Sequence, residues 1–322
     1  MLIHRSSDTI HIAAPAKVNL FLEVLGKRPD GYHEVQTVLC PVSLFDQLTF
    51  ESRAGGAIEF HVRFPWVAAP GTDGRRPPAG HDPAWDVPTD HRNLVVRAVR
   101  QVQQAVGTTQ GCRIELTKNI PAAAGLGGGS SDTAAAVVAS LLAWHRWDRQ
   151  LALEICAAMG SDVPFFLGDE THFGLAAATG RGERCQLLPA EPPLDLLITH
   201  PPVGCSTSQV YLNYADGAPK RDFAKFVAAC EAGDPKKIGA GLFNALQFAA
   251  SQMTEWIDRQ LQVYATCGAA HAILSGSGSS CFAVVDEPGC EARVRLAAAA
   301  CGLPRVYRAQ AWYGHSIEHQ DA

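Results

Sequence analysis

Long apolar runs and paired cysteines are both missing from this 322-residue sequence. No apolar run reaches the roughly 18 residues that a membrane-spanning helix needs, so we expect no such helix. Neither terminus carries a charged segment followed by an apolar core, so we expect no signal peptide and a cytoplasmic protein. The ten cysteines form no CxxC pair, which argues against a structural zinc site and favours free thiols in a reducing compartment.

Strong net charge and the two best-known phosphate motifs are lacking as well. The formal net charge is −5, which gives no general attraction to nucleic acid or to an anionic membrane. A P-loop needs a Lys after its glycines, and no Lys follows the glycines of Gly125–Gly129. A dinucleotide-binding GxGxxG would need Gly where Ser130 stands. A phosphate site at this loop must therefore take its cation from another part of the chain.

A glycine-rich loop is the most informative feature that is present. Four glycines lie within Gly125–Gly129, and the hydroxyls of Ser130 and Ser131 follow at once. Glycine backbones can turn several N–H groups toward one anion and let it approach closely. A helix after the loop would add unpaired N–H groups and the positive end of its dipole. The loop therefore predicts a phosphate site, with a flexible loop or an ordinary helix cap as the alternative.

The residues on either side of the loop predict a strand and then a helix. Residues 112–118 alternate between apolar and polar side chains, which is typical of a strand. Apolar residues at 134, 137, 138, 141 and 142 form one stripe of a helix. Ser130 or Ser131 would cap this helix, with Asp132 in its first turn. Asp132 would weaken the local field at a phosphate unless it points to the helix side.

The length of the chain suggests two domains, and Pro189–Pro193 is the predicted boundary. Residues 65–88 hold six prolines and three glycines and predict an irregular surface loop. Strands are expected at 18–25, 34–42, 47–52, 57–63, 112–118, 172–178, 184–188, 194–200, 271–274, 281–285 and 305–312. Further helices are expected at 93–106, 149–159, 207–213, 221–231, 235–241, 244–266 and 289–301.

Two other segments carry candidate functional side chains. Lys17 and Asn19 are two residues apart on a predicted strand, so they face the same side of it. The alternative for Lys17 is a solvated side chain at the start of a strand. Asp162 lies two residues before Pro164, and its alternative role is to cap the turn that the proline enforces.

Taken together, these segments resemble the GHMP small-molecule kinases. Pro15–Leu20, Pro121–Ser131 and Gly276–Gly278 look like the three motifs of that superfamily. Arg28–His33 and Gly160–Pro164 are similar to one branch of it. That branch phosphorylates a methylerythritol that carries a cytidine diphosphate, in the non-mevalonate isoprenoid pathway. The resemblance runs from about residue 11 to residue 312.

The resemblance implies an α+β fold of two domains, 1–189 and 190–322, with the active site in the cleft between them. ATP would be the phosphoryl donor, with Mg²⁺ as cofactor, and the products would be the 2-phosphate and ADP. Asp162 would be the general base for the attacking hydroxyl, while Lys17 would stabilise the developing charge. The hydroxyl of Ser130 or Ser131 could touch Mg²⁺, and the other metal ligands stay open.

The same resemblance assigns two groups of binding residues. Tyr32 and Tyr211 would stack on the cytosine ring, and His33 would hydrogen-bond its edge. The alternatives are half-buried packing for Tyr32, a solvated Lys118 and, for the whole chain, another GHMP kinase or a catalytically silent nucleotide-binding module. The nucleotide residues are Pro121, Gly125, Leu126, Gly127, Gly128, Gly129, Ser130, Ser131, Lys118 and Asn93, and the substrate residues are Asn19, Tyr32, His33, Thr207 and Tyr211.

Overall fold

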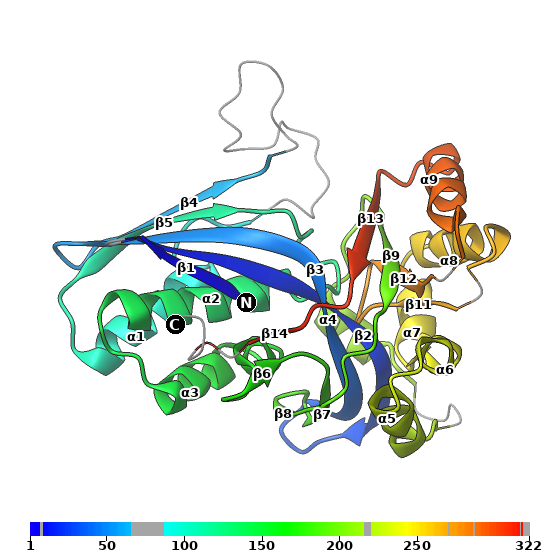
Figure 1. Cartoon of the computed structure of the whole chain (residues 1–322), viewed down its shortest axis with the longest axis horizontal. Coiled ribbons are helices and arrows are strands. Elements are labelled where there is room, and N and C mark those ends of the chain that lie inside the picture. Colours follow the sequence, from blue (N-terminus) through cyan, green and yellow to red (C-terminus); the bar gives the residue numbers. More distant parts are fainter. Residues whose placement is uncertain are drawn as a thin grey trace.

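The computed structural model describes residues 1–6, 9–65, 87–215, 220–269, 271–285, 287–315 and 317. The predicted surface loop at 65–88 lies almost wholly outside these residues. The described chain forms two parts that lie side by side, each a sheet with helices packed on it (Figure 1). The fold is α+β, as the sequence predicted.

The larger sheet is built mainly from the first half of the chain. Its strands follow the order β1-β2-β3-β5-β4, while β7 pairs with β3 and with β8. All its pairs are antiparallel except β4 with β5 and β10 with β2. The bounds are β1 Leu2–Ser6, β2 Thr9–Lys27, β3 His33–Arg53, β4 Ile58–Arg63, β5 Gly111–Thr117, β7 Ala176–Gly180, β8 Arg184–Leu187 and β10 Phe243–Asn244.

Three helices cover one face of this sheet: α1 (Leu94–Val106), α2 (Gly128–Ala143) and α3 (Arg149–Met159) (Figure 1). Helix α2 lies in the middle and packs on β2 and β3 as well as on the two other helices. Every residue from Ser131 to Leu142 is buried, so α2 is a core helix rather than an amphipathic one. Because the glycine loop leads directly into α2, the packing of this helix fixes where the loop ends.

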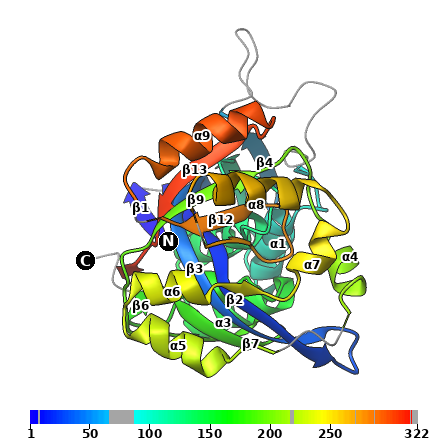
Figure 2. The same cartoon turned by 90° about the vertical axis from the view of Figure 1, so that its right-hand side faces the viewer.

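The smaller sheet is antiparallel, in the order β11-β12-β9-β13. Helices α8 and α9 lie across one face of it (Figure 2). The strands are β9 Asp195–His200, β11 Ala272–Leu274, β12 Cys281–Val284 and β13 Arg305–Gln310. The helices of this half are α4 Thr207–Leu212, α5 Phe223–Glu231, α6 Pro235–Gly241, α7 Gln247–Ser251, α8 Trp256–Thr266 and α9 Cys290–Ala300.

Two short strands from late in the chain join elements of the first half. Strand β10 pairs with β2 at Phe21 and Leu22, inside the larger sheet. Strand β14 (Gly314–His315) pairs with β6 (His172–Phe173), and the centre of the Phe173 ring lies 5.6 Å from that of the Phe165 ring in the 3-10 helix η2 (Pro164–Leu167). The chain therefore crosses between its two parts more than once, and a division at residues 189 and 190 stays a prediction.

Several predicted elements have different bounds in the structure. The strands expected at 34–42 and 47–52 are one continuous β3, and β1 was not predicted at all. The single helix expected at 244–266 is wrong. Asn244 belongs to β10, and α7 and α8 are separate helices. The hydroxyl of Thr254 accepts a hydrogen bond from the backbone N–H of Trp256 at 3.3 Å, in the turn between the two helices.

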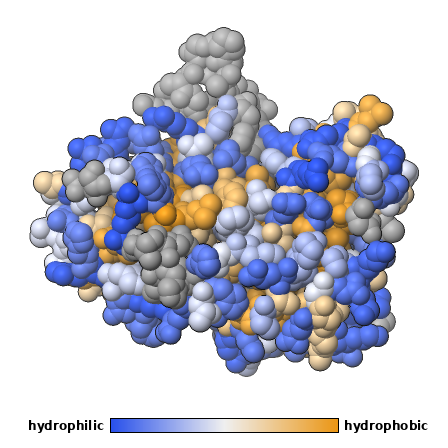
Figure 3. All heavy atoms as spheres, in the orientation of Figure 1, coloured by the Kyte–Doolittle hydropathy of each residue, from blue (hydrophilic) through white to orange (hydrophobic). Residues whose placement is uncertain are grey.

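The cysteines confirm the expectation of free thiols. All ten are unpaired, and eight of them are buried. Among the described residues no helix is both long and apolar enough to cross a bilayer. The face of the molecule in Figure 3 is mostly hydrophilic, with hydrophobic side chains gathered in a few small groups.

Candidate active site

A cavity of about 960 Å³ is lined by residues from both halves of the chain. The first half contributes most of the loop Pro121–Ser130, the side chains of Lys17 and Asp162, and the turn at Tyr32. The second half contributes Thr207 and its neighbours on α4, together with Gly276–Gly278. Segments that are far apart in sequence therefore meet in one cleft.

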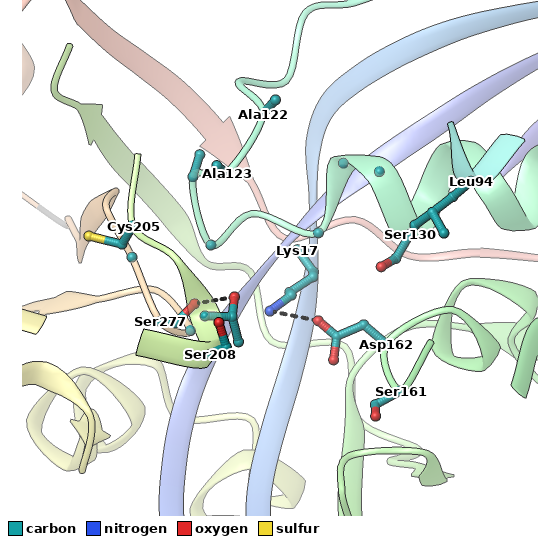
Figure 4. A pocket seen from close by; sticks show the side chains of 18 of the residues that line it. Lys17, Leu94, Ala122, Ala123, Ser130, Ser161, Asp162, Cys205, Ser208 and Ser277 are labelled. Carbon is teal, nitrogen blue, oxygen red and sulfur yellow. Dashed lines mark hydrogen bonds and ion pairs between the residues drawn. The ribbon is translucent and has the colours of Figure 1, made fainter. Parts of the chain in front are cut away.

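The side chains of Lys17 and Asp162 point toward each other in this cavity (Figure 4). The Nζ atom of Lys17 lies 3.2 Å from Oδ2 of Asp162. The Lys17 side chain is 4% exposed, whereas that of Asp162 is 36% exposed. The carboxylate thus faces the open space from which a substrate would approach, and the ammonium lies behind it.

Lys17 is held in place from several sides. Its Nζ donates to Oδ1 of Asn19 at 2.6 Å, and Asn19 donates from Nδ2 to the Thr37 hydroxyl at 2.8 Å. The Lys17 backbone N–H donates to the carbonyl of Leu126 at 2.9 Å. Lys17 and Asn19 therefore share one side of β2, as their spacing predicted, and a solvated Lys17 is excluded.

Asp162 lies in the short connection between α3 and the 3-10 helix η2. Helix α3 ends at Met159 with Gly160 as its C-cap, and Pro164 begins η2, so the chain turns sharply between the two helices. Val163 is the residue before η2, and no side chain caps this helix in the described part of the chain. The alternative that Asp162 caps the turn is therefore wrong, because its carboxylate pairs with Lys17 instead.

The glycine loop packs too closely against its neighbours for larger residues. A Cβ on Gly125 would lie 2.1 Å from the carbonyl oxygen of Ser275, and one on Gly127 would lie 2.8 Å from Cγ of Lys17. Both glycines also have positive φ, +76° and +70°. The predicted cap is wrong: α2 begins at Gly128 with Gly127 before it, earlier than Ser130 or Ser131.

Most of the predicted nucleotide residues line the cavity, but two do not. The residues that line it are Pro121, Gly125, Gly127, Gly128, Gly129 and Ser130. Leu126 packs into the core with 1% exposure, and Ser131 is fully buried on the inner side of α2. Because the early helix start turns Ser131 inward, Ser130 is the hydroxyl of the pair that faces the cavity (Figure 4).

Lys118 and Asn93 are also at the cavity, and both are engaged within the chain. Lys118 is 2% exposed and forms ion pairs with Asp46 and Asp132, so the alternative of a solvated Lys118 is wrong. Asp132 thus pairs with a cation and does not cap helical N–H groups. Asn93 caps α1 by accepting from the Val95 N–H at 2.8 Å, and its Nδ2 donates to the carbonyl of Pro88 at 2.7 Å.

The aromatic residues predicted for the substrate side gather at the other end of the cavity. The ring of His33 stacks on Tyr211, with centroids 5.0 Å apart and planes at 28°. Tyr32 is 54% exposed, which excludes half-buried packing for its ring. Burial raises the pKa of Tyr211, and the charge of Asp162 raises it further, so its hydroxyl stays protonated. Thr207, one turn before Tyr211 on α4, shares a 2.9 Å hydrogen bond with the Ser277 hydroxyl.

The sequence did not single out two cations that line the same end of the cavity, Lys27 and Arg181. The guanidinium carbon of Arg181 lies 4.7 Å from the centre of the Tyr32 ring. Within the described ranges, neither side chain forms an ion pair. The turn at Gly180–Gly182 was visible in the sequence, but its proximity to Tyr32 depends on the pairing of β7 with β3.

The comparisons with known proteins decide the family. The model of the GHMP kinases N terminal domain matches residues 93–169, and that of the GHMP kinases C terminal matches residues 226–302. A 4-diphosphocytidyl-2-C-methyl-D-erythritol kinase from Pelotomaculum thermopropionicum is 40% identical over 85% of this chain and 88% of its own length. The chain belongs to the 4-diphosphocytidyl-2-C-methyl-D-erythritol kinase family. This is a family of small-molecule kinases within the GHMP superfamily.

Other relatives agree with this placement. A 4-diphosphocytidyl-2-C-methyl-D-erythritol kinase from Rhodopirellula baltica is 35% identical over 85% of this chain and 86% of its own length. A crystal structure of a 4-(cytidine 5'-diphospho)-2C-methyl-D-erythritol kinase superposes with a TM-score of 0.70 at 30% identity, covering 94% of this chain and 99% of the other. A homoserine kinase from Cytophaga hutchinsonii has a TM-score of 0.69 at 18% identity, over 98% and 99% of the chains, and shares the fold alone. The predicted two-domain GHMP kinase fold is confirmed.

Proposed function

We propose that this chain transfers the γ-phosphoryl group of ATP to a hydroxyl of 4-diphosphocytidyl-2-C-methyl-D-erythritol, giving the 2-phosphate and ADP. The observation that carries the proposal is the Lys17–Asp162 pair, 3.2 Å apart, in the cavity that the glycine loop also lines. Membership of the kinase family supports the same acceptor. A cytoplasmic location stays a prediction of the sequence.

The roles of the two charged residues follow from their positions. Asp162 accepts the proton of the substrate hydroxyl as that oxygen forms a bond to the γ-phosphorus. The bond between the γ-phosphorus and the β,γ-bridging oxygen breaks, and ADP leaves with that oxygen and the electron pair. Lys17 lies behind the carboxylate and stabilises the negative charge that gathers on the alkoxide and the phosphoryl oxygens. Transfers of this kind run through loose transition states, so positioning and charge stabilisation supply most of the rate.

The residues at the glycine loop suit ATP and Mg²⁺. The backbone of Gly125–Gly129 and the start of α2 face the cavity and would hold the phosphates. Mg²⁺ prefers oxygen ligands and is commonly held by one or two protein groups together with substrate phosphates. The Ser130 hydroxyl and the Asp162 carboxylate are oxygen donors that line the cavity, so they fit such an ion. When bound, Mg²⁺ would neutralise charge on the phosphates.

The opposite end of the cavity suits a cytidine diphosphate. Tyr32 offers an exposed ring for stacking on a pyrimidine, while His33 and Tyr211 form an aromatic pair beside it. Lys27 and Arg181 supply positive charge for a diphosphate, since both lack an ion-pair partner in the described chain. Homoserine and mevalonate carry neither a pyrimidine nor a diphosphate, so they would not bind these groups in this way.

A panel of acceptors tests the proposal. Purified protein with ATP and Mg²⁺ should form ADP rapidly with the cytidine diphosphate substrate and slowly, if at all, with methylerythritol phosphate, homoserine or mevalonate. Phosphorus NMR of the product should show one new monophosphate ester. Faster turnover of homoserine or mevalonate would favour another GHMP kinase. ATP binding with no phosphorylated product would favour a catalytically silent module.

Replacing Tyr32 by Ala should raise KM for the cytidine substrate and leave kcat nearly unchanged. Stacking of a base on an aromatic ring contributes about 1–3 kcal/mol, which corresponds to a rise in KM of about 5- to 150-fold. The loss is shared by the ground state and the transition state, so kcat is spared. Steady-state kinetics measures both constants. Tyr32→Phe should recover most of the loss, because it restores the ring, and an unchanged KM in Tyr32→Ala would contradict the stacking role.

A further inference from the structure

Three buried charged residues lie beneath the glycine loop, at a site that the proposed chemistry does not use. They are Asp46 on β3, Lys118 just after β5, and Asp132 in the first turns of α2. Their side chains are 0%, 3% and 4% exposed. Charged groups are rarely buried this completely unless they are paired, so the arrangement requires an explanation.

Asp46 binds the whole link between β5 and the glycine loop. Its Oδ2 pairs with Nζ of Lys118, and its Oδ1 accepts from the backbone N–H groups of Asn119 and Ile120, the latter at 2.9 Å. The Asn119 amide also donates to the carbonyl of Phe45 at 2.7 Å. Lys118, Asn119 and Ile120 therefore each bond to Asp46 on β3, and Asn119 bonds to Phe45 as well.

The link that Asp46 holds is in direct contact with the start of α2. A Cβ on Gly128 would lie 2.8 Å from Cγ2 of Ile120 and 3.2 Å from Nζ of Lys118. Lys118 also donates to Oδ2 of Asp132 at 2.7 Å. The segment Lys118–Ile120 before the glycine loop therefore also contacts Gly128 and Asp132 at the start of α2. A shift of this segment would move the loop N–H groups that face the cavity.

The two carboxylates that share Lys118 are not equivalent. Asp46 has hydrogen-bond partners on both oxygens, whereas Oδ1 of Asp132 is buried and has no hydrogen-bond partner among the described residues. Burial raises the pKa of Asp132 well above its usual range, and the neighbouring charge of Asp46 raises it further. Asp46 therefore holds both Lys118 and the backbone of the link, whereas Asp132 holds Lys118 alone.

We propose that Asp46 is a positioning residue for nucleotide binding: through Lys118 and the backbone of Asn119–Ile120 it holds the glycine loop in the shape that receives ATP phosphates. Asp46 is not among the residues that line the cavity. The inference rests on the proposed function only in taking ATP as the ligand of the loop. It predicts a defect confined to the nucleotide side of the reaction.

Two variants that each turn one carboxyl partner of Lys118 into an amide separate this role from a general effect of changing the pairing of Lys118. Asp46→Asn and Asp132→Asn each leave Lys118 with one carboxylate, but only Asp46 accepts from the loop backbone. Asp46→Asn should raise the Kd of a non-hydrolysable ATP analogue and the KM for ATP by about 10-fold, the loss expected when charge-assisted hydrogen bonds are weakened. Its kcat and its KM for the acceptor should stay within about twofold of wild type. Asp132→Asn should change the Kd less than about threefold.

Matched controls keep the result decisive. Glu115→Gln removes a carboxylate from β5 that pairs with Arg63 and Arg113 at the surface, so its ATP affinity should stay at the wild-type value. Asn119→Ala removes the tie to Phe45 without leaving a buried charge unpaired, and it should weaken ATP binding in the same direction as Asp46→Asn. If Asp46→Asn fails to fold, unchanged ATP binding in Asn119→Ala overturns the proposal.

The outcome is independent of the acceptor, because calorimetry with the ATP analogue measures nucleotide binding in the absence of any acceptor. Equal losses in Asp46→Asn and Asp132→Asn would overturn the proposal, as would an acceptor KM that rises as much as the ATP KM. A wild-type protein that binds the analogue but phosphorylates no cytidine diphosphate substrate would count against the proposed function and leave this comparison intact.

Discussion

Replacing Asp162 by Asn should lower kcat by about 10²- to 10⁴-fold, the usual contribution of a general base, while ATP still binds. The amide keeps the size of the side chain but cannot take the proton of the attacking hydroxyl. Asp162→Ala, which removes the carboxylate altogether, should abolish turnover. The Asp162 side chain is 36% exposed, and Lys17 keeps its hydrogen bond to Asn19 when the carboxylate is lost, so neither change should unfold the protein.

The matched control for this loss is Glu170→Gln. Glu170 is an exposed carboxylate eight positions further along the same stretch of chain and does not line the cavity. It should keep wild-type kcat and KM values. Single-turnover kinetics separates the chemical step from product release, and turnover of Asp162→Asn within a few-fold of wild type would refute the assignment of the base.

Replacing Lys17 by Met should lower kcat by about 10²- to 10³-fold, the loss typical of removing one group that stabilises developing charge. Met fills a similar volume with no charge. Asp162 keeps its access to solvent, so the ionised carboxylate is not left buried and unpaired. Steady-state kinetics should show the loss in kcat, with KM for ATP changed much less.

Two comparisons test whether Lys17 and Asp162 act together. Lys225→Met removes a lysine charge from the exposed side of α5 and should leave the kinetics unchanged. The double variant Lys17→Met/Asp162→Asn should lose much less than the product of the two single losses, since each residue depends on the other in one step. Fully multiplicative losses would mean that the two residues act independently.

The local features of the site could be read from the sequence. Glycine at positive φ, the shared side of Lys17 and Asn19, and the sharp turn before Pro164 all follow from rules that act over a few residues. The start of α2 was placed too late, at Ser130 or Ser131, because those residues are good caps. Tertiary packing of the glycine loop against Ser275 and Lys17 overrides that preference and starts the helix at Gly128.

Contacts between distant segments could not be read in the same way. The ion pairs of Lys118 with Asp46 and Asp132 join residues 72 and 14 positions apart, and no local pattern specifies them. The contact of Arg181 with Tyr32 depends equally on how β7 pairs with β3. The sequence allowed a solvated Lys118 for this reason, and burial excludes it.

The sequence by itself predicted a phosphate site at a loop without its own lysine, since four glycines and the following helix favour that geometry locally. The tertiary structure decided which lysine lies against this loop beside Asp162. Lys17 reaches Asp162 because β2 lies against the loop, where the backbone N–H of Lys17 donates to the carbonyl of Leu126. It also decided that Lys118 is buried between Asp46 and Asp132, because a buried ammonium is costly unless the fold brings opposite charges to it.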